Sequence, residues 1–126
     1  MTLVDTSSLI HFLRKNGDPV VSQRVRLLIQ KDQAALCPMV IAELWMGASS
    51  KSDKEDIEDL VSLLHHFPIQ EEVWKTANRL AAICRSKGTP VPGSDLVIAA
   101  CAFFRQAEIE SSDRHFDILE KYRPLL

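Results

Sequence analysis

The sequence predicts an α/β protein in which a mainly parallel sheet of about four or five strands is flanked by helices on both faces. Two observations favour this fold. Short apolar stretches typical of strands alternate along the chain with longer segments whose apolar residues recur at helical spacing. Asp5 follows the first strand-like stretch directly, and turn-forming residues come after it. Ligands of open α/β sheets bind where the strands end, so function is expected at the edge that carries Asp5.

Length and composition are typical of a single soluble domain spanning residues 1–126. Of the 126 residues, 46% are hydrophobic and 25% are charged. The net charge of −2 excludes a broadly basic nucleic-acid clamp, so a polyanion would have to be bound by local basic residues or by metal ions. We expect a cytoplasmic protein without membrane contact, because no leader-like segment or bilayer-length apolar run is present. Cys37, Cys84 and Cys101 are expected to be reduced core residues.

The first third of the chain contains the strand that leads to Asp5. Residues 6–8 are good helix-capping types, and a cluster of turn residues at 16–19 separates two helical segments. The second of these segments is amphipathic, with apolar residues on one side and basic residues on the other. The expected elements are a strand at 2–4, helices at 8–15 and 20–31, and a short buried strand at 34–37.

Residues 39–48 predict a helix that is apolar nearly all round and therefore buried. Glu43 is its only charged residue. Because an ionised carboxylate is costly to bury alone, Glu43 either binds a cation, pairs with an arginine, or occupies a gap at the surface. A fourth, more polar helix follows, and Ser52 and Glu55 have the spacing of a capping box at its start.

The last half of the chain contains two strongly helical segments. A long helix is expected over residues 71–87, with Gly88 as its stop and Trp74 on its core-facing side. An apolar helix over residues 96–104 is opened by Asp95, which the helix dipole favours at that position in any protein. Beyond it the sequence predicts a polar strand at 107–111, a short helix after Asp113, and a closing strand or ordered end at 122–126.

Four acidic residues can converge on one edge of this sheet. Asp5 and Asp113 follow strands, whereas Glu43 and Asp95 lie early in helices that follow the connections between strands. Carboxylates brought this close repel one another unless a cation neutralises them. Oxygen-only sites suit Mg²⁺ or Mn²⁺, and such ions catalyse phosphodiester hydrolysis. The sequence therefore predicts a metal-dependent phosphodiesterase.

Four segments around these acids resemble, in the same order, the motifs of PIN-domain nucleases. They are residues 4–7, 42–44, 94–100 and 111–116. Within that superfamily the chain is similar to VapC-type toxins of VapBC toxin-antitoxin systems. The resemblance implies a PIN-like α/β/α sandwich and a Mg²⁺- or Mn²⁺-dependent endoribonuclease. It also implies a VapB-like antitoxin as inhibitor, a homodimer, and Asp5, Glu43, Asp95 and Asp113 as the metal-binding and catalytic quartet.

Several neighbouring residues are candidates for supporting roles. Ser7, Ser111 and Thr6 can hold a carboxylate or a water in place, although each is also a common cap or turn residue. Ser7 and Arg114 are candidate substrate-binding residues, and Arg114 can contact RNA phosphate. Arg14, Lys15, Arg85 and Lys87 are candidates for a wider basic rim. His115 is a residue type that can act as a general acid, but it stays outside the predicted catalytic set because the sequence does not fix its geometry.

Other functional classes remain open at this point. A receiver-type signalling domain needs a phosphoacceptor aspartate after a middle strand, where this chain has Pro38. A haloacid-dehalogenase-type phosphatase needs a second aspartate two residues after Asp5, where this chain has Ser7. A PIN-like binding module without catalysis would have no need of four mutually repelling carboxylates. A housekeeping RNA-processing nuclease of the PIN type is the remaining alternative.

Overall fold

Four short parallel strands form the central sheet of the computed structural model, which describes residues 1–126. The strands lie in the order β3-β2-β1-β4, so the N-terminal strand is an inner strand of the sheet. Thr2 of β1 is in register with Ala34 of β2 on one side and with Glu108 of β4 on the other. The strand bounds are Thr2–Val4 for β1, Ala34–Leu36 for β2, His65–His66 for β3 and Glu108–Glu110 for β4.

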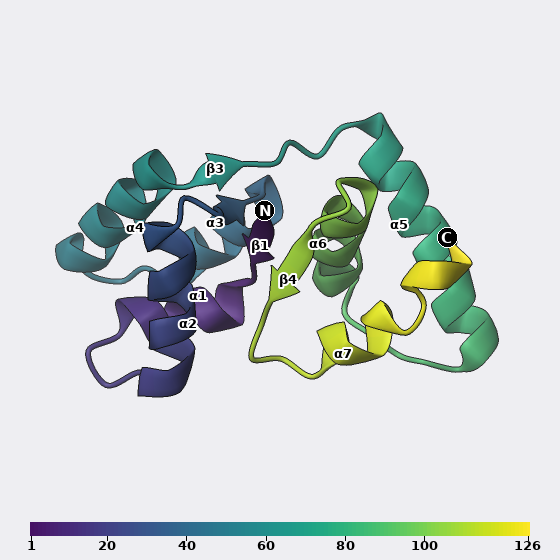
Figure 1. Ribbon diagram of the computed structural model, residues 1–126, viewed down its shortest axis with the longest axis horizontal. Helices are drawn as coiled ribbons and strands as arrows, with labels where there is room; N and C mark the ends of the chain where they lie inside the picture. Colours follow the sequence, from purple (N-terminus) through teal and green to yellow (C-terminus); the bar gives the residue numbers. More distant parts are fainter.

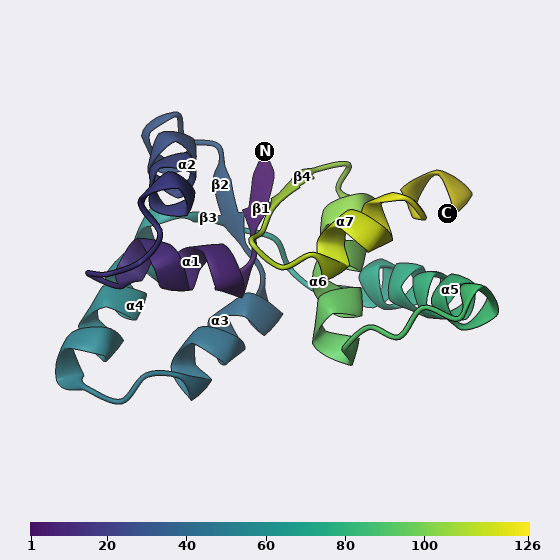
Figure 2. The same cartoon turned by 90° about the horizontal axis from the view of Figure 1, so that it is seen from below.

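Seven α-helices flank this sheet. Figures 1 and 2 both show α1 to α4 gathered on one side of the molecule and α5 to α7 on the other, with β1 and β4 between the two groups. The α/β/α arrangement with a parallel sheet confirms the predicted fold. The helices are α1 (Thr6–Leu13), α2 (Pro19–Gln30), α3 (Pro38–Met46), α4 (Lys51–Leu63), α5 (Glu71–Lys87), α6 (Gly93–Phe104) and α7 (His115–Glu120), followed by a 3-10 helix at Arg123–Leu125.

One hydrophobic core joins the sheet to both groups of helices. The strands β1 and β2 are almost completely buried, as is typical of inner parallel strands covered on both faces. Helix α6 is buried along most of its length because it packs against α5, α7, α3 and β4. The largest side chains without solvent exposure are Leu3, Leu9, Leu36, Leu80, Ile98 and Leu119.

Local sequence signals place several elements as predicted. Helix α5 spans Glu71–Lys87, and Gly88 ends it in the left-handed conformation with φ of 66°. The strand β4 is polar because it is an edge strand and Glu108 is exposed to solvent. Cys37, Cys84 and Cys101 are free thiols in the core, as expected. None of the helices combines the length and apolar character needed to cross a bilayer.

The predicted burial of the third helix and of Trp74 is wrong. Only Val40 and Leu44 of α3 are buried, whereas Trp45 is 39% and Met46 is 85% exposed. Trp74 on α5 is 48% exposed. When every side of a helix is apolar, its sequence does not indicate which side packs against the rest of the protein. Here only one side of α3 is covered.

Two details of the predicted boundaries are also corrected. Helix α1 begins at Thr6 instead of residue 8, and Asp5 is its N-cap. The capping box of α4 is formed by Ser50 and Asp53, which precede the predicted pair. Of the two alternatives for the last residues, the structure has the ordered end and not the strand: they form a 3-10 helix in which the Leu125 N–H donates to the Tyr122 carbonyl at 2.9 Å.

Candidate metal centre

Asp5 lies at the carboxyl end of β1, where the chain turns into α1. Its backbone N–H donates to the Glu110 carbonyl at 2.8 Å, which continues the β1-β4 ladder to the residue that carries the carboxylate. The side chain is only 4% exposed. A carboxylate that is buried to this extent needs hydrogen-bond donors around it, and Ser7 and Ser111 supply them.

Two serine hydroxyls, one from each end of the chain, donate to the same oxygen of Asp5. Ser7 Oγ lies 2.7 Å and Ser111 Oγ lies 3.0 Å from Asp5 Oδ2. Each hydroxyl in turn accepts a backbone N–H, Ser7 from Ser112 at 3.1 Å and Ser111 from Asp113 at 2.9 Å. The two hydroxyl oxygens also lie 3.1 Å from each other, so Asp5 Oδ2, Ser7 and Ser111 form one hydrogen-bonded group. This group ties the loop that carries Asp113 to the start of α1.

Glu43 of α3 is held by the residue next to Asp5. Thr6 Oγ1 donates to Glu43 Oε1 at 2.8 Å, and Thr6 is buried. This single hydrogen bond connects α3 to the first turn of α1. Glu43 is half-buried at one wall of a groove of about 600 Å³ between α1, α3 and α4, which Arg14 and Lys15 also line. Asp53 and Asp56 line the groove from α4, so its charge is mixed.

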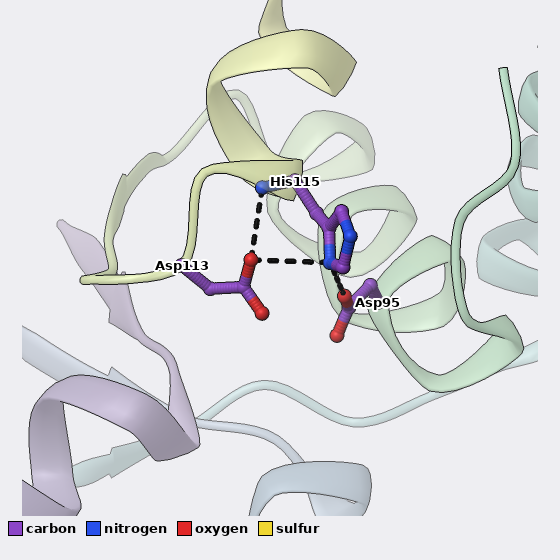
Figure 3. Close-up of side chains that lie close together, drawn as sticks. All are labelled: Asp95, Asp113 and His115. Carbon is purple, nitrogen blue, oxygen red and sulfur yellow. Dashed lines mark hydrogen bonds and ion pairs between the residues drawn. The ribbon is translucent and has the colours of Figure 1, made fainter.

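Asp95, Asp113 and His115 form a compact cluster in which one ligand atom from each lies within 4.8 Å of the others. Figure 3 shows the His115 ring beside both carboxylates, with Nδ1 3.0 Å from Asp95 Oδ2 and 3.1 Å from Asp113 Oδ1. The His115 backbone N–H also donates to Asp113 Oδ1 at 2.9 Å. Asp95 comes from the first turn of α6, His115 is the first residue of α7, and Asp113 lies in the turn that precedes α7.

Burial is the main reason why the pKa of Asp95 is raised above its ordinary value. The negative charges of Asp113 and Asp5 raise it further, while the hydrogen bond and charge of His115 act in the opposite direction. Asp5 is therefore near enough to Asp95 for their charges to interact. The structure thus places Asp95 and Asp113 in one cluster and Asp5 near enough to act on the charge of Asp95. Glu43 lies outside that cluster and is joined to Thr6, the residue after Asp5.

The four acidic residues share one pattern of hydrogen bonding. In each, one oxygen lies within hydrogen-bond distance of a protein group: Asp5 Oδ2, Glu43 Oε1, Asp95 Oδ2 and Asp113 Oδ1. At Asp95 the partner is His115 Nδ1, which donates only in the tautomer that places a hydrogen on this nitrogen. The second oxygen of each carboxylate has no protein donor, and none of these atoms is sealed away from solvent. The carboxylates are therefore oriented by the protein and keep four oxygens available. A set of hard oxygen donors of this kind fits a divalent cation such as Mg²⁺ or Mn²⁺.

Sequence reasoning missed His115 as part of this cluster. Its contact with Asp113 is local and follows from the turn before α7, so the two-residue spacing was a usable signal. Its contact with Asp95 depends on how α6 and α7 pack, which no local pattern reveals. Ser7, Ser111 and Thr6 do hold carboxylates, as predicted. Arg114 is exposed at the start of α7, while Arg85 and Lys87 lie in the last turn of α5.

Comparison with known families identifies the family of this chain. The sequence profile of the PIN domain matches residues 2–122, which is nearly the whole chain. The chain belongs to the PIN domain family. This PIN domain is 29% identical over 118 residues to Ribonuclease VapC18 of Mycobacterium tuberculosis, a match that covers 90% of this chain and 83% of that protein.

Solved structures share the fold of this PIN domain. VapBC2 from Rickettsia felis, bound to a DNA fragment from its promoter, matches with a TM-score of 0.80 at 20% identity and covers 93% of this chain and 91% of that one. VapC20 of Mycobacterium tuberculosis, a toxin that cleaves the sarcin-ricin loop, matches with a TM-score of 0.71 at 15% identity over 94% of each chain. The PIN domain fold is therefore supported by sequence and by structure.

Proposed function

We propose that this PIN domain is an endoribonuclease that hydrolyses RNA phosphodiester bonds with a divalent metal ion held by Asp5, Glu43, Asp95 and Asp113. The observation that supports this most is that each of these carboxylates has one oxygen fixed by the protein and one oxygen left free. Preorganised charge of this kind is a main source of catalysis in phosphoryl chemistry. The similarity to VapC18, a ribonuclease, and to VapC20, which cleaves the sarcin-ricin loop, agrees with an RNA substrate.

The donor set supports Mg²⁺ or Mn²⁺ as the cofactor. A bound divalent ion supplies a Lewis acid that lowers the pKa of the attacking water and offsets negative charge on the reacting phosphate. In the protein, Ser7 and Ser111 orient the buried Asp5 carboxylate, and Thr6 orients Glu43. Arg114, exposed beside Asp113, is positioned to meet a backbone phosphate of the substrate.

We also propose that the protein is the toxin of a toxin-antitoxin pair, inhibited by a VapB-like antitoxin. Support comes from the similarity to VapC18 and from the VapBC complex that shares the fold. A housekeeping nuclease would not need such a partner. Expression of the chain with and without its candidate antitoxin tests this directly: growth should stop with the toxin alone, continue with both proteins, and continue with Asp5→Asn alone. Arrest by Asp5→Asn would contradict it.

Cleavage of a mixed panel of structured RNAs tests the enzymatic proposal. Purified protein is incubated with Mg²⁺ or Mn²⁺, with EDTA in a parallel series, and products are separated on a denaturing gel. Asp5→Asn and Asp117→Asn are prepared identically; the second residue is an exposed acid on α7 with no side-chain partner. We expect cleavage by the wild type and by Asp117→Asn, and none with EDTA or with Asp5→Asn.

Equal cleavage by the wild type and Asp5→Asn would overturn the proposal, because the activity would then come from a contaminant or another site. Light scattering on the same preparation tests the expected homodimer. Thermal unfolding of each variant shows that any lost activity does not come from lost structure.

A further inference from the structure

His115 occupies an unusual position between two acidic residues of the proposed centre. Its Nδ1 atom faces Asp95 Oδ2 at 3.0 Å and Asp113 Oδ1 at 3.1 Å (Figure 3). The backbone of the same residue donates to Asp113, so the start of α7 fixes the ring on the side of the carboxylates. The His115 side chain is 31% exposed. The ring therefore forms one wall of the cluster instead of lying free at the surface.

The Nδ1 atom of His115 cannot donate a hydrogen bond to both carboxylates that face it, whereas a cation between the three atoms could interact with all of them. Nδ1 carries at most one hydrogen, so it can donate to only one of the two carboxylate oxygens that face it. Nε2 has no protein partner in the structure and is free to carry the hydrogen of a neutral ring. In that tautomer the Nδ1 lone pair points at two anionic oxygens, which is unfavourable unless a positive ion lies among the three atoms.

The spacing of the three atoms agrees with that of ligands around one ion. Adjacent ligands of an octahedral ion with bonds of about 2.1 Å are separated by about 3.0 Å. The nitrogen lies at this separation from both oxygens. We propose that on metal binding His115 carries its hydrogen on Nε2, exchanges its Nδ1 contacts with these carboxylates for a bond to the ion, and becomes a direct ligand together with Asp95 and Asp113. We further propose that this nitrogen makes the site bind Mn²⁺ and other first-row transition ions more tightly than Mg²⁺. The inference rests on the proposed metal-dependent function.

The chemistry of the donor set gives the direction of the preference. Mg²⁺ is a hard ion that binds oxygen and keeps its waters, so an imidazole adds little to its affinity. Transition ions accept imidazole nitrogen readily, and their affinities for nitrogen and oxygen sites rise from Mn²⁺ towards Cu²⁺. An all-carboxylate quartet would distinguish the ions less. His115 is the residue that gives this centre its mixed character.

Substitution of His115 by asparagine tests the contribution of the nitrogen itself, because the asparagine side chain can place an oxygen near the position of Nδ1. Calorimetry on the purified protein measures Mn²⁺ and Mg²⁺ dissociation constants separately for the wild type and His115→Asn. We expect the Mn²⁺ constant to rise about 10-fold or more, within the range usual for lost metal-site contacts, and the Mg²⁺ constant to change by less than about 3-fold. Unchanged thermal unfolding without metal shows that the variant is folded.

Electron spin-echo modulation of the Mn²⁺-loaded protein provides a readout independent of activity. The wild type should show coupling of the ion to one imidazole nitrogen, and His115→Asn should lose it. His66→Gln, a change at an exposed histidine on β3, should retain it. Bound Mn²⁺ without nitrogen coupling, or equal changes in both dissociation constants, would overturn the inference. Nitrogen-coupled Mn²⁺ in a protein that cleaves no RNA would support the ligand and contradict the proposed function instead.

Discussion

Ser111 donates a hydrogen bond to Asp5 across 106 positions of sequence, at 3.0 Å. This bond joins the end of β4 to the end of β1 at the residue that we place at the centre of the metal site. Ser111 also accepts the backbone N–H of Asp113, so one hydroxyl orients two of the four acids. The contribution of the Ser111 hydroxyl to activity can be measured separately from that of Ser112.

We expect Ser111→Ala to fold and to cleave RNA about 10- to 100-fold more slowly than the wild type. The substitution removes the hydrogen bond to Asp5 and the one that holds the backbone of Asp113. Ser112→Ala is the matched control, since only the backbone of Ser112 takes part in this network. Initial cleavage rates at saturating metal measure both. Equal rates for the two variants would show that the Ser111 hydroxyl is dispensable.

Thr6 controls the position of Glu43 through one hydrogen bond. Thr6→Val keeps the shape of the side chain and removes the donor, whereas Thr6→Ser keeps the donor and removes a methyl group. We expect the valine variant to bind metal and cleave RNA about 10-fold more weakly, and the serine variant to remain close to the wild type. Metal titration followed by the cleavage assay checks this order. A serine variant as impaired as the valine variant would point to packing instead.

We expect Asp95 to lower the stability of the metal-free protein at neutral pH. Its pKa is raised in the folded state, mainly by burial, so the folded protein holds this proton more tightly than the unfolded chain does. The contribution of Asp95 to stability therefore falls as the pH rises above the ordinary aspartate pKa of about 3.9. In EDTA at pH 7, Asp95→Asn should unfold at the same temperature as the wild type or higher.

Added metal should reverse this order. Mn²⁺ stabilises the wild type by binding to the folded state only, and Asp95→Asn should show little of that shift. Asp117→Asn should behave as the wild type both with metal and in EDTA. Thermal scans at several pH values measure both effects, and a wild type that is more stable than Asp95→Asn in EDTA at neutral pH would contradict the argument.

Glu110 connects β4 to two helices of the N-terminal half. It accepts from the buried Ser8 hydroxyl at 2.8 Å and from Arg24 Nε at 2.7 Å. Glu110→Met should cost about 1–3 kcal/mol in the free energy of unfolding, because it leaves the Ser8 hydroxyl buried without an acceptor. Glu108→Met is the control, as Glu108 is exposed on the same strand. Urea unfolding measures both variants, and equal losses would rule out a special role for Glu110.

Local patterns in the sequence account for much of the fold. The long helix α5 is predicted to the residue because its apolar spacing is regular and Gly88 can adopt the left-handed conformation that ends it. Asp5 is placed correctly because it follows a short apolar strand directly. The alternation of strands and helices then requires a parallel sheet, whose carboxyl ends share one edge.

Features that depend on packing between distant elements could not be predicted in this way. Trp45 and Met46 belong to a helix that is apolar on every side, and only the arrangement of α1, α4 and α6 determines which side is covered. The contact of His115 with Asp95 depends in the same manner on how α7 docks on α6. The start of α4 likewise differs from the prediction, because its capping box is formed by Ser50 and Asp53 and not by Ser52 and Glu55.

The inner position of β1 affects how the protein matures during its synthesis. The strand β1 is synthesised before β4, which completes its pairing, and Asp5 receives its second serine only from residue 111. The contacts of β1 with β4 therefore cannot form until the C-terminal part of the chain has been made. Such long-range pairing is typical of slow-folding parallel sheets. A nascent chain that has not yet exposed residue 115 lacks part of the metal centre that we propose, so we expect the chain to be inert while most of it is being translated.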